Sequence, residues 1–116
     1  MRYRIRRTIE FKDQYQKLTR KNRPLEVRLD RKIAEIVRNP EEIGKPKRYA
    51  LKYARGSHVD PYVIIYIIIG DVILFIYVDH HDFVYEEAPR VLGDIELQFP
   101  ELWAAMPPGL RQKLKR

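Results

Sequence analysis

The feature that most constrains this chain is an apolar segment, residues 61–78, whose side chains are almost all β-branched or aromatic. Gly70 and Asp71 interrupt the segment near its centre. An aspartate at the centre of a bilayer costs about 3 kcal/mol, and neither half of the segment is long enough to span a membrane as a helix. Because β-branched and aromatic residues favour strands, the segment predicts two strands, residues 62–69 and 72–79. Gly70 and Asp71 form a two-residue hairpin loop between them, and both sheet faces are expected to be covered.

Two amphipathic helices are predicted before this hairpin. Apolar residues recur at helical spacing over residues 11–18 and again over residues 25–37. Pro24 is typical of a first helical turn, and Asn39-Pro40 is typical of a helix end. The two helices therefore form a helical hairpin with a short connection.

Two further strands complete the predicted sheet. Residues 2–9 alternate between arginines and other residues, and residues 47–55 place tyrosine and leucine on one face. Residues 56–61 are expected to form a turn. The predicted fold class is α+β, in the order β-α-α-β-β-β, with a helical hairpin packed on a small, mostly antiparallel sheet and a C-terminal extension.

The length of 116 residues indicates one domain. Residues 1–88 contain the predicted sheet and helical hairpin. Residues 89–116 are expected to be a C-terminal extension that packs on the same domain and ends in a basic tail. Leu102, Trp103 and Met106 are the apolar residues expected to pack back on the sheet.

Positive charge is concentrated in the first half of the chain. Residues 1–60 carry 18 lysines and arginines against 8 aspartates and glutamates, a net charge of +10 within a total of +7. Such a surface favours a polyanionic partner, although a charge-rich surface that only keeps a protein in solution has the same composition. The chain has no cysteine, which excludes disulfides and thiolate catalysis and fits a cytoplasmic setting.

A cationic cluster lies before the apolar hairpin. Its five cations are interleaved with Tyr49 and Tyr53, and they are Lys45, Lys47, Arg48, Lys52 and Arg55. Cations neutralise phosphates and aromatic rings stack on bases, so this pattern predicts RNA binding. The alternative is an edge strand that its charges protect against aggregation.

A second cluster, residues 79–85, follows the last apolar strand and contains His80, His81, Asp82 and Tyr85. Histidine titrates near neutral pH and can act as a general acid or base. A hydrogen-bonded strand end is the structural alternative. We expect no metal site, because adjacent residues on a strand point to opposite faces and the spacing of the ligands is poor.

Several short motifs occur along the chain in a characteristic order. They are Ile36-Val37-Arg38-Asn39-Pro40, Ile43-Gly44-Lys45-Pro46, Arg55-Gly56-Ser57, Tyr62 and Tyr66 on one strand, and Val78-Asp79-His80-His81-Asp82 before Tyr85. In these motifs the sequence resembles the RelE/ParE superfamily of type II toxin–antitoxin toxins, over roughly residues 3–85. The resemblance implies a small antiparallel sheet flanked by two helices.

In the RelE branch, the resemblance implies an mRNA interferase that cleaves mRNA on the ribosome by attack of the ribose 2′-OH. Such an enzyme uses neither a metal ion nor another cofactor. A cognate antitoxin, the ribosome and mRNA would be its partners, with no membrane involved. The ParE branch instead implies a toxin that poisons DNA gyrase.

The residue patterns and the resemblance together assign the candidate site. The catalytic candidates are Lys52, Arg55, His80, His81 and Tyr85. The RNA-binding candidates are Lys45, Lys47, Arg48, Tyr53, His58 and Asp82. RelE-like sequences usually carry an arginine where this chain has Val63. A catalytically degenerate member that binds only RNA or an antitoxin is therefore a third interpretation.

Overall fold

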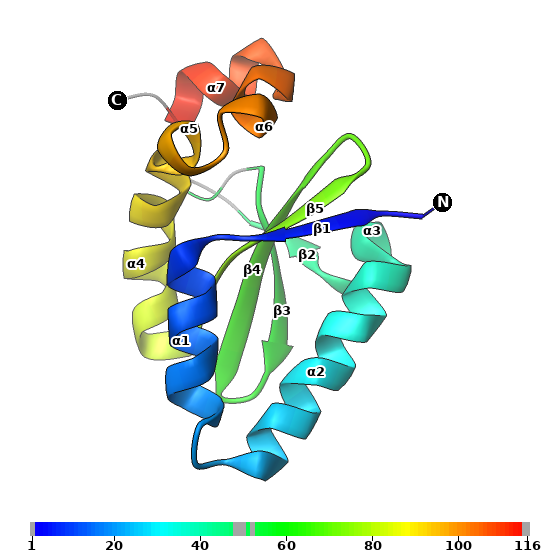
Figure 1. The fold of residues 1–116 in the computed structure, drawn as a ribbon, viewed down its shortest axis with the longest axis vertical. Coiled ribbons are helices and arrows are strands. Elements are labelled where there is room, and N and C mark those ends of the chain that lie inside the picture. Colours follow the sequence, from blue (N-terminus) through cyan, green and yellow to red (C-terminus); the bar gives the residue numbers. More distant parts are fainter. Residues whose placement is uncertain (1, 48–50, 52, 115–116) are drawn as a thin grey trace.

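The computed structural model describes residues 2–47, 51 and 53–114, and its centre is a five-stranded sheet (Figure 1). The strands lie in the order β1-β5-β4-β3-β2. Their bounds are Arg4–Arg7 for β1, Lys45–Pro46 for β2, Arg55–Val59 for β3, Tyr62–Ile69 for β4 and Val72–His80 for β5. β1 runs parallel to β5, and the other neighbouring strands pair antiparallel. The predicted α+β class and the mostly antiparallel sheet are confirmed.

The hairpin of β4 and β5 forms as the apolar segment predicts. Gly70 has a φ of 59°, in the left-handed region that a tight hairpin turn requires and that glycine adopts without strain. The Arg4 guanidinium hydrogen-bonds to the carboxylate of Asp71, with Nη2 at 3.1 Å from Oδ1, and this contact holds the pKa of Asp71 below its usual range. The turn is thereby linked to the N-terminal strand.

The helical hairpin consists of α1, Ile9–Thr19, and α2, Arg23–Arg38. The hydroxyl of Thr8 accepts a hydrogen bond from the backbone of Phe11 at 2.9 Å and begins α1. The side chain of Asn22 accepts one from the backbone of Leu25 at 3.1 Å and begins α2. Both helices pack on one face of the sheet, and a short helix, α3, Pro40–Ile43, follows.

The chain after β5, which includes the extension predicted from residue 89, covers the opposite face (Figure 1). It forms α4, His81–Gly93, α5, Ile95–Gln98, α6, Pro100–Ala105, and α7, Pro108–Leu114. Leu102 and Met106 are buried in the core on this face, with Trp103 packed against them, as predicted. In the described part of the chain, no helix is both long enough and apolar enough to cross a membrane.

The alternation of side chains along β4 and β5 divides the core between these two layers. Ile64, Tyr66 and Phe75 face α1 and α2, whereas Val63 and Ile65 face α4. The hydroxyl of Tyr66 donates to the carbonyl of Pro40 and accepts from the backbone N–H of Gly44. A Cβ at position 44 would lie 2.3 Å from that hydroxyl, so only glycine allows this close approach.

One predicted strand, residues 47–55, is wrong. β2 contains only Lys45 and Pro46, and β3 begins at Arg55 and continues through the region predicted as a turn. Leu51 and Tyr53 do not share a strand face. Leu51 is buried but is not in a strand, and Tyr53 has a φ of 48°, which strands do not adopt. Arg48, Tyr49 and Lys52 lie outside the described residues. The first strand is also shorter than predicted.

Candidate functional site

Lys47 and Tyr85 are in direct contact, although they are far apart in the sequence. The Nζ of Lys47 lies 3.0 Å from the Tyr85 hydroxyl and 5.0 Å from the centre of its ring. Gly56 makes room for the lysine, because a Cβ at this position would lie 2.3 Å from Cε of Lys47. The long lysine side chain therefore crosses β3 to reach α4.

His81 lies one helical turn before Tyr85 and on the same side of α4. The helix begins where the strand ends, because the His81 backbone donates to the carbonyl of Pro61 at 2.9 Å. The Nδ1 atom of His80 caps the helix by accepting from the backbone N–H of Asp82 at 3.1 Å. The imidazole of His81 is exposed.

His58 lies on β3, two residues after Gly56 and thus on the same face of that strand. It pairs with Val63, which faces α4, so the His58 side chain is directed to the α4 side. Its Nδ1 lies 3.5 Å from the carboxylate of Asp60. Lys47 contacts Tyr85, and His58 and His81 lie on the same side of the sheet; we call these four residues the β3–α4 site.

His80 lies on the other side of the sheet. It pairs with Tyr62, and the two rings meet edge to face with centroids 6.0 Å apart. A groove of about 520 Å³ lies beside it, lined in part by Lys17 of α1, Asp79 and Asp82. Asp79 is held by hydrogen bonds from the Tyr77 hydroxyl and the His80 backbone. Burial, together with the nearby Asp79 carboxylate, raises the pKa of Tyr77 to about 12, so this tyrosine remains a hydrogen-bond donor at neutral pH.

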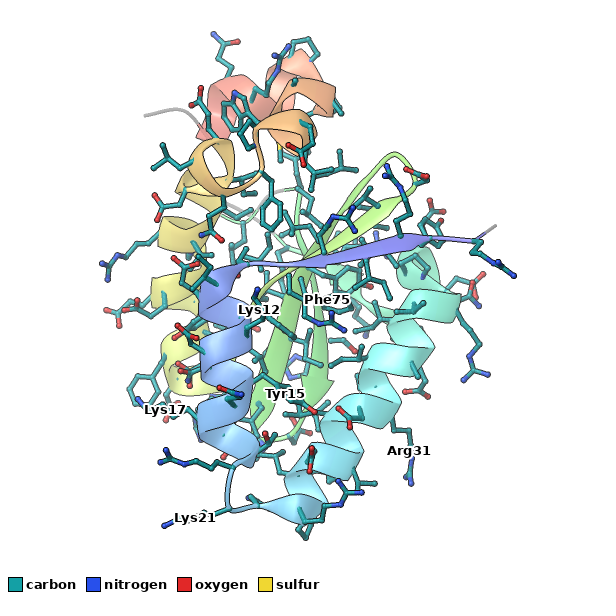
Figure 2. All side chains as sticks on the ribbon, viewed as in Figure 1. Lys12, Tyr15, Lys17, Lys21, Arg31 and Phe75 are labelled. Carbon is teal, nitrogen blue, oxygen red and sulfur yellow. The ribbon has the colours of Figure 1, made fainter. Side chains whose placement is uncertain are left out.

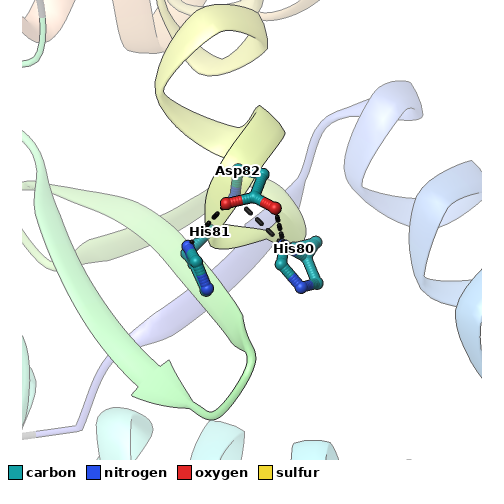
Figure 3. Close-up of side chains that lie close together, drawn as sticks. All are labelled: His80, His81 and Asp82. Carbon is teal, nitrogen blue, oxygen red and sulfur yellow. Dashed lines mark hydrogen bonds and ion pairs between the residues drawn. The ribbon is translucent and has the colours of Figure 1, made fainter.

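The two histidines nevertheless lie close together (Figure 3). Their ring centroids are 4.4 Å apart, and both Nδ1 atoms approach the carboxylate of Asp82, at 3.4 Å from His80 and 3.0 Å from His81. Because β5 ends at His80 and α4 begins at His81, the two are not neighbours on one strand, and their rings lie close together although His80 faces the α1 side of the sheet. The turn into the helix changes the direction of the second ring.

Arg55 is not near Tyr85. It pairs with Tyr66 and lies on the α2 side of the sheet. Its guanidinium donates to the carbonyl of Gly44, with Nε at 3.0 Å, and to the carbonyl of Glu41. Lys45 is exposed on β2, and Tyr53 is 47% exposed after that strand. The catalytic and RNA-binding candidates are therefore spread over both faces.

Two features of the site have only weak sequence signals. The Lys47–Tyr85 contact depends on Gly56, and the Arg55-Gly56-Ser57 motif marks that glycine without indicating its partner. Val63, at the position where an arginine was expected, is completely buried under α4. A charged side chain at this position would therefore be buried in the apolar core under α4.

A large apolar groove lies between the edge strand β1 and the helical hairpin. Its volume is about 1010 Å³, and Ile5, Ile33 and Val37 contribute to its lining. Figure 2 shows Tyr15 of α1 directed into the space between the two helices. Its hydroxyl donates to the carboxylate of Asp30 on α2, and burial together with this carboxylate raises the pKa of Tyr15.

No protein-family model and no curated protein matches the sequence. Solved structures do match. A chain of the toxin–antitoxin complex RelBE2 from Mycobacterium tuberculosis is 24% identical, with a TM-score of 0.59, over 70% of this chain and 100% of that chain. YafQ from E. coli strain BL21(DE3) is 18% identical, with a TM-score of 0.62, over 72% of this chain and 98% of that chain.

These matches show the fold: the chain is folded like a chain of the RelBE2 toxin–antitoxin complex and like YafQ, and a RelE-like fold is what the sequence motifs predict. Both solved structures span about 70% of the chain, so part of it has no counterpart in them.

Proposed function

We propose that this protein is the toxin of a type II toxin–antitoxin system and that it cleaves mRNA on the ribosome without a metal ion. The fold supports the toxin class. The observation that carries the proposed chemistry is the β3–α4 site, in which the Nζ of Lys47 lies 3.0 Å from the Tyr85 hydroxyl. His81 is exposed one helical turn away.

Cleavage by a 2′-OH requires three groups, and the site offers one for each. His81 removes the proton from the 2′-OH, whose oxygen then attacks the adjacent phosphorus. Lys47 stabilises the negative charge that develops on the phosphorane oxygens. The Tyr85 hydroxyl donates a proton to the leaving 5′ oxygen, so the products are a 2′,3′-cyclic phosphate and a 5′-hydroxyl end. Lys45 and His58 bind the flanking RNA.

Buried Val63 favours one second candidate function. The site lacks a cation at that position, and α4 packs over it, so fewer positive charges are available to stabilise the phosphorane. A protein of this kind binds RNA through phosphate contacts, with a steep dependence on salt, but does not cleave it.

Primer extension on transcripts separates these candidates. We expect that induced expression in a bacterial host arrests growth and produces discrete cuts within translated regions, with 2′,3′-cyclic phosphate ends. Purified protein should cut the same mRNA only when ribosomes are present and should remain active in EDTA. Growth arrest with intact mRNA and DNA damage signalling would instead indicate a gyrase poison. Salt-sensitive RNA binding without cuts would indicate the degenerate form.

We further propose that an antitoxin segment occupies the groove between β1 and the helical hairpin. β1 lies at the edge of the sheet, so its outer backbone groups are placed to pair with an added strand. The apolar lining of the groove next to this edge suits alternate apolar side chains of the same segment. Exposed Arg7, Lys12 and Arg38 at the groove favour an acidic segment.

Substitution in the groove tests this partner. We expect Val37→Asp to weaken binding of the antitoxin, co-expressed from the neighbouring gene, by about 10- to 100-fold, because it places a carboxylate in the apolar lining. Arg31→Ala is the control, because it makes the same change in net charge on α2 and its side chain extends away from α1 (Figure 2). Equal affinity for wild type and Val37→Asp, measured by calorimetry, would place the antitoxin elsewhere.

A further inference from the structure

His80, His81 and Asp82 place three potential metal ligands at the junction of β5 and α4 (Figure 3). Each residue offers one ligand atom, and the three atoms lie within 4.8 Å of one another. The carboxylate of Asp82 stands between the two imidazoles, 3.4 Å from Nδ1 of His80 and 3.0 Å from Nδ1 of His81. The two imidazole rings do not diverge as those of adjacent residues on one strand would.

These distances match the separation of two ligands on one ion. Zinc binds imidazole nitrogen at about 2.0–2.1 Å and carboxylate oxygen at about 2.0–2.2 Å, so the ligands of a tetrahedral ion are about 3.3–3.5 Å apart. The two nitrogen–oxygen distances in the cluster are close to this separation but reach different oxygens of Asp82, and the three ligand atoms lie within 4.8 Å of one another. A small approach of the two rings toward the carboxylate would therefore complete a three-ligand site.

The donor set and its surroundings favour a transition metal ion. Two imidazoles with one carboxylate suit Zn²⁺ better than Mg²⁺ or Ca²⁺, which prefer oxygen ligands. The backbone N–H of Asp82 occupies the lone pair of His80 Nδ1, so zinc would bind this imidazole through Nε2 or replace the helix cap. His81 and Asp82 are exposed, so an ion can reach the cluster from solvent.

The local charge permits a cation there. The first turn of α4 disfavours positive charge, because the N-terminal end of a helix carries a partial positive charge. The Asp82 carboxylate in that turn opposes this effect. The neighbouring groove of about 520 Å³, which Lys17 also lines, has room for the water ligands that complete the coordination.

We propose that His80, His81 and Asp82 bind one Zn²⁺ ion. Zinc on His81 would occupy the imidazole that the proposed cleavage uses as its base, so bound Zn²⁺ should inhibit cleavage; zinc binding itself does not depend on whether the chain cleaves RNA. A metal titration therefore tests it independently of any activity.

The titration uses full-length protein without an affinity tag, so that no added histidines bind zinc. We expect calorimetry to give one Zn²⁺ per chain for the wild type and no comparable binding of Mg²⁺. His81→Ala and Asp82→Asn each remove one ligand, and we expect an affinity loss of at least about 10- to 100-fold, the loss typical even of outer-shell partners. His58→Ala is the matched control, because it removes the histidine paired with Asp60.

The control variant should bind Zn²⁺ like the wild type. Absence of binding to the wild type, or an equal loss in His58→Ala, would overturn the proposal. NMR of the wild type provides a readout that does not depend on the folding of any variant. Zn²⁺ should shift the imidazole signals of His80 and His81 and leave those of His58 in place, and a shift of His58 alone would contradict the assignment.

Discussion

Replacement of Phe75 by alanine is expected to lower the free energy of unfolding by about 3–5 kcal/mol. Phe75 is completely buried, and its ring lies 5.3 Å from that of Phe11 and 6.0 Å from that of Tyr66. Its strand, β5, also pairs with strands on both sides. A domain of this size is stable by about 5–15 kcal/mol, so the substitution removes a large fraction of the total. Urea denaturation followed by circular dichroism measures the change.

Leu97→Ala is the control for Phe75→Ala. Leu97 is 81% exposed on α5, so removal of its side chain should change the stability by less than about 0.5 kcal/mol. A loss below about 1 kcal/mol in Phe75→Ala would mean that the layer between the sheet and the helical hairpin is packed differently from the structure described above.

Removal of the His81 imidazole is expected to reduce the rate of ribosome-dependent mRNA cleavage by about 10²- to 10⁴-fold, the range typical of a lost general acid or base. Tyr85→Phe should also reduce the cleavage rate, because it removes the hydroxyl that Lys47 contacts and nothing else. Both side chains are exposed, so the fold should be unaffected. Single-turnover cleavage with saturating toxin measures the chemical step.

Tyr3→Phe is the control for Tyr85→Phe, because it removes a tyrosine hydroxyl on the α1 and α2 side of the sheet. We expect it to cleave at the wild-type rate. Unchanged cleavage in both His81→Ala and Tyr85→Phe would remove the β3–α4 site from the mechanism, even if the protein cleaves mRNA. Loss of cleavage in His80→Ala alone would move the acid–base role to the opposite side of the sheet.

The layers of this fold were largely predictable from the sequence. Nearly every residue of β4 and β5 is apolar, so both faces of the sheet must be covered. The two helices have clear apolar stripes. Local sequence patterns therefore determine these elements. The error at residues 47–55 has a physical cause. Leu51 and Ala54 are buried in the core although neither belongs to a strand. Sequence alternation cannot distinguish that burial from a strand face.

The candidate site was less predictable because it depends on direction in space. His80 and His81 were recognised as candidates, but their relative orientation depends on a strand that changes into a helix between them. Arg55 has the residue type expected of a catalytic cation, yet backbone carbonyls of Glu41 and Gly44 occupy its guanidinium. The contact of Lys47 with Tyr85 depends on the missing side chain of Gly56, which no charge pattern reveals.

The parallel pairing of β1 with β5 has a consequence for synthesis of the chain. Arg4 pairs with Val72, so the first strand has no β5 to join until nearly all of the sheet has been translated. The arginines of β1 help to prevent aggregation until β5 has been synthesised, since charged side chains protect an unpaired strand. β5 ends at His80, and His81 and Tyr85 follow on α4. A nascent chain therefore acquires the two residues proposed as acid–base groups only as its sheet closes, and a truncated product lacks them.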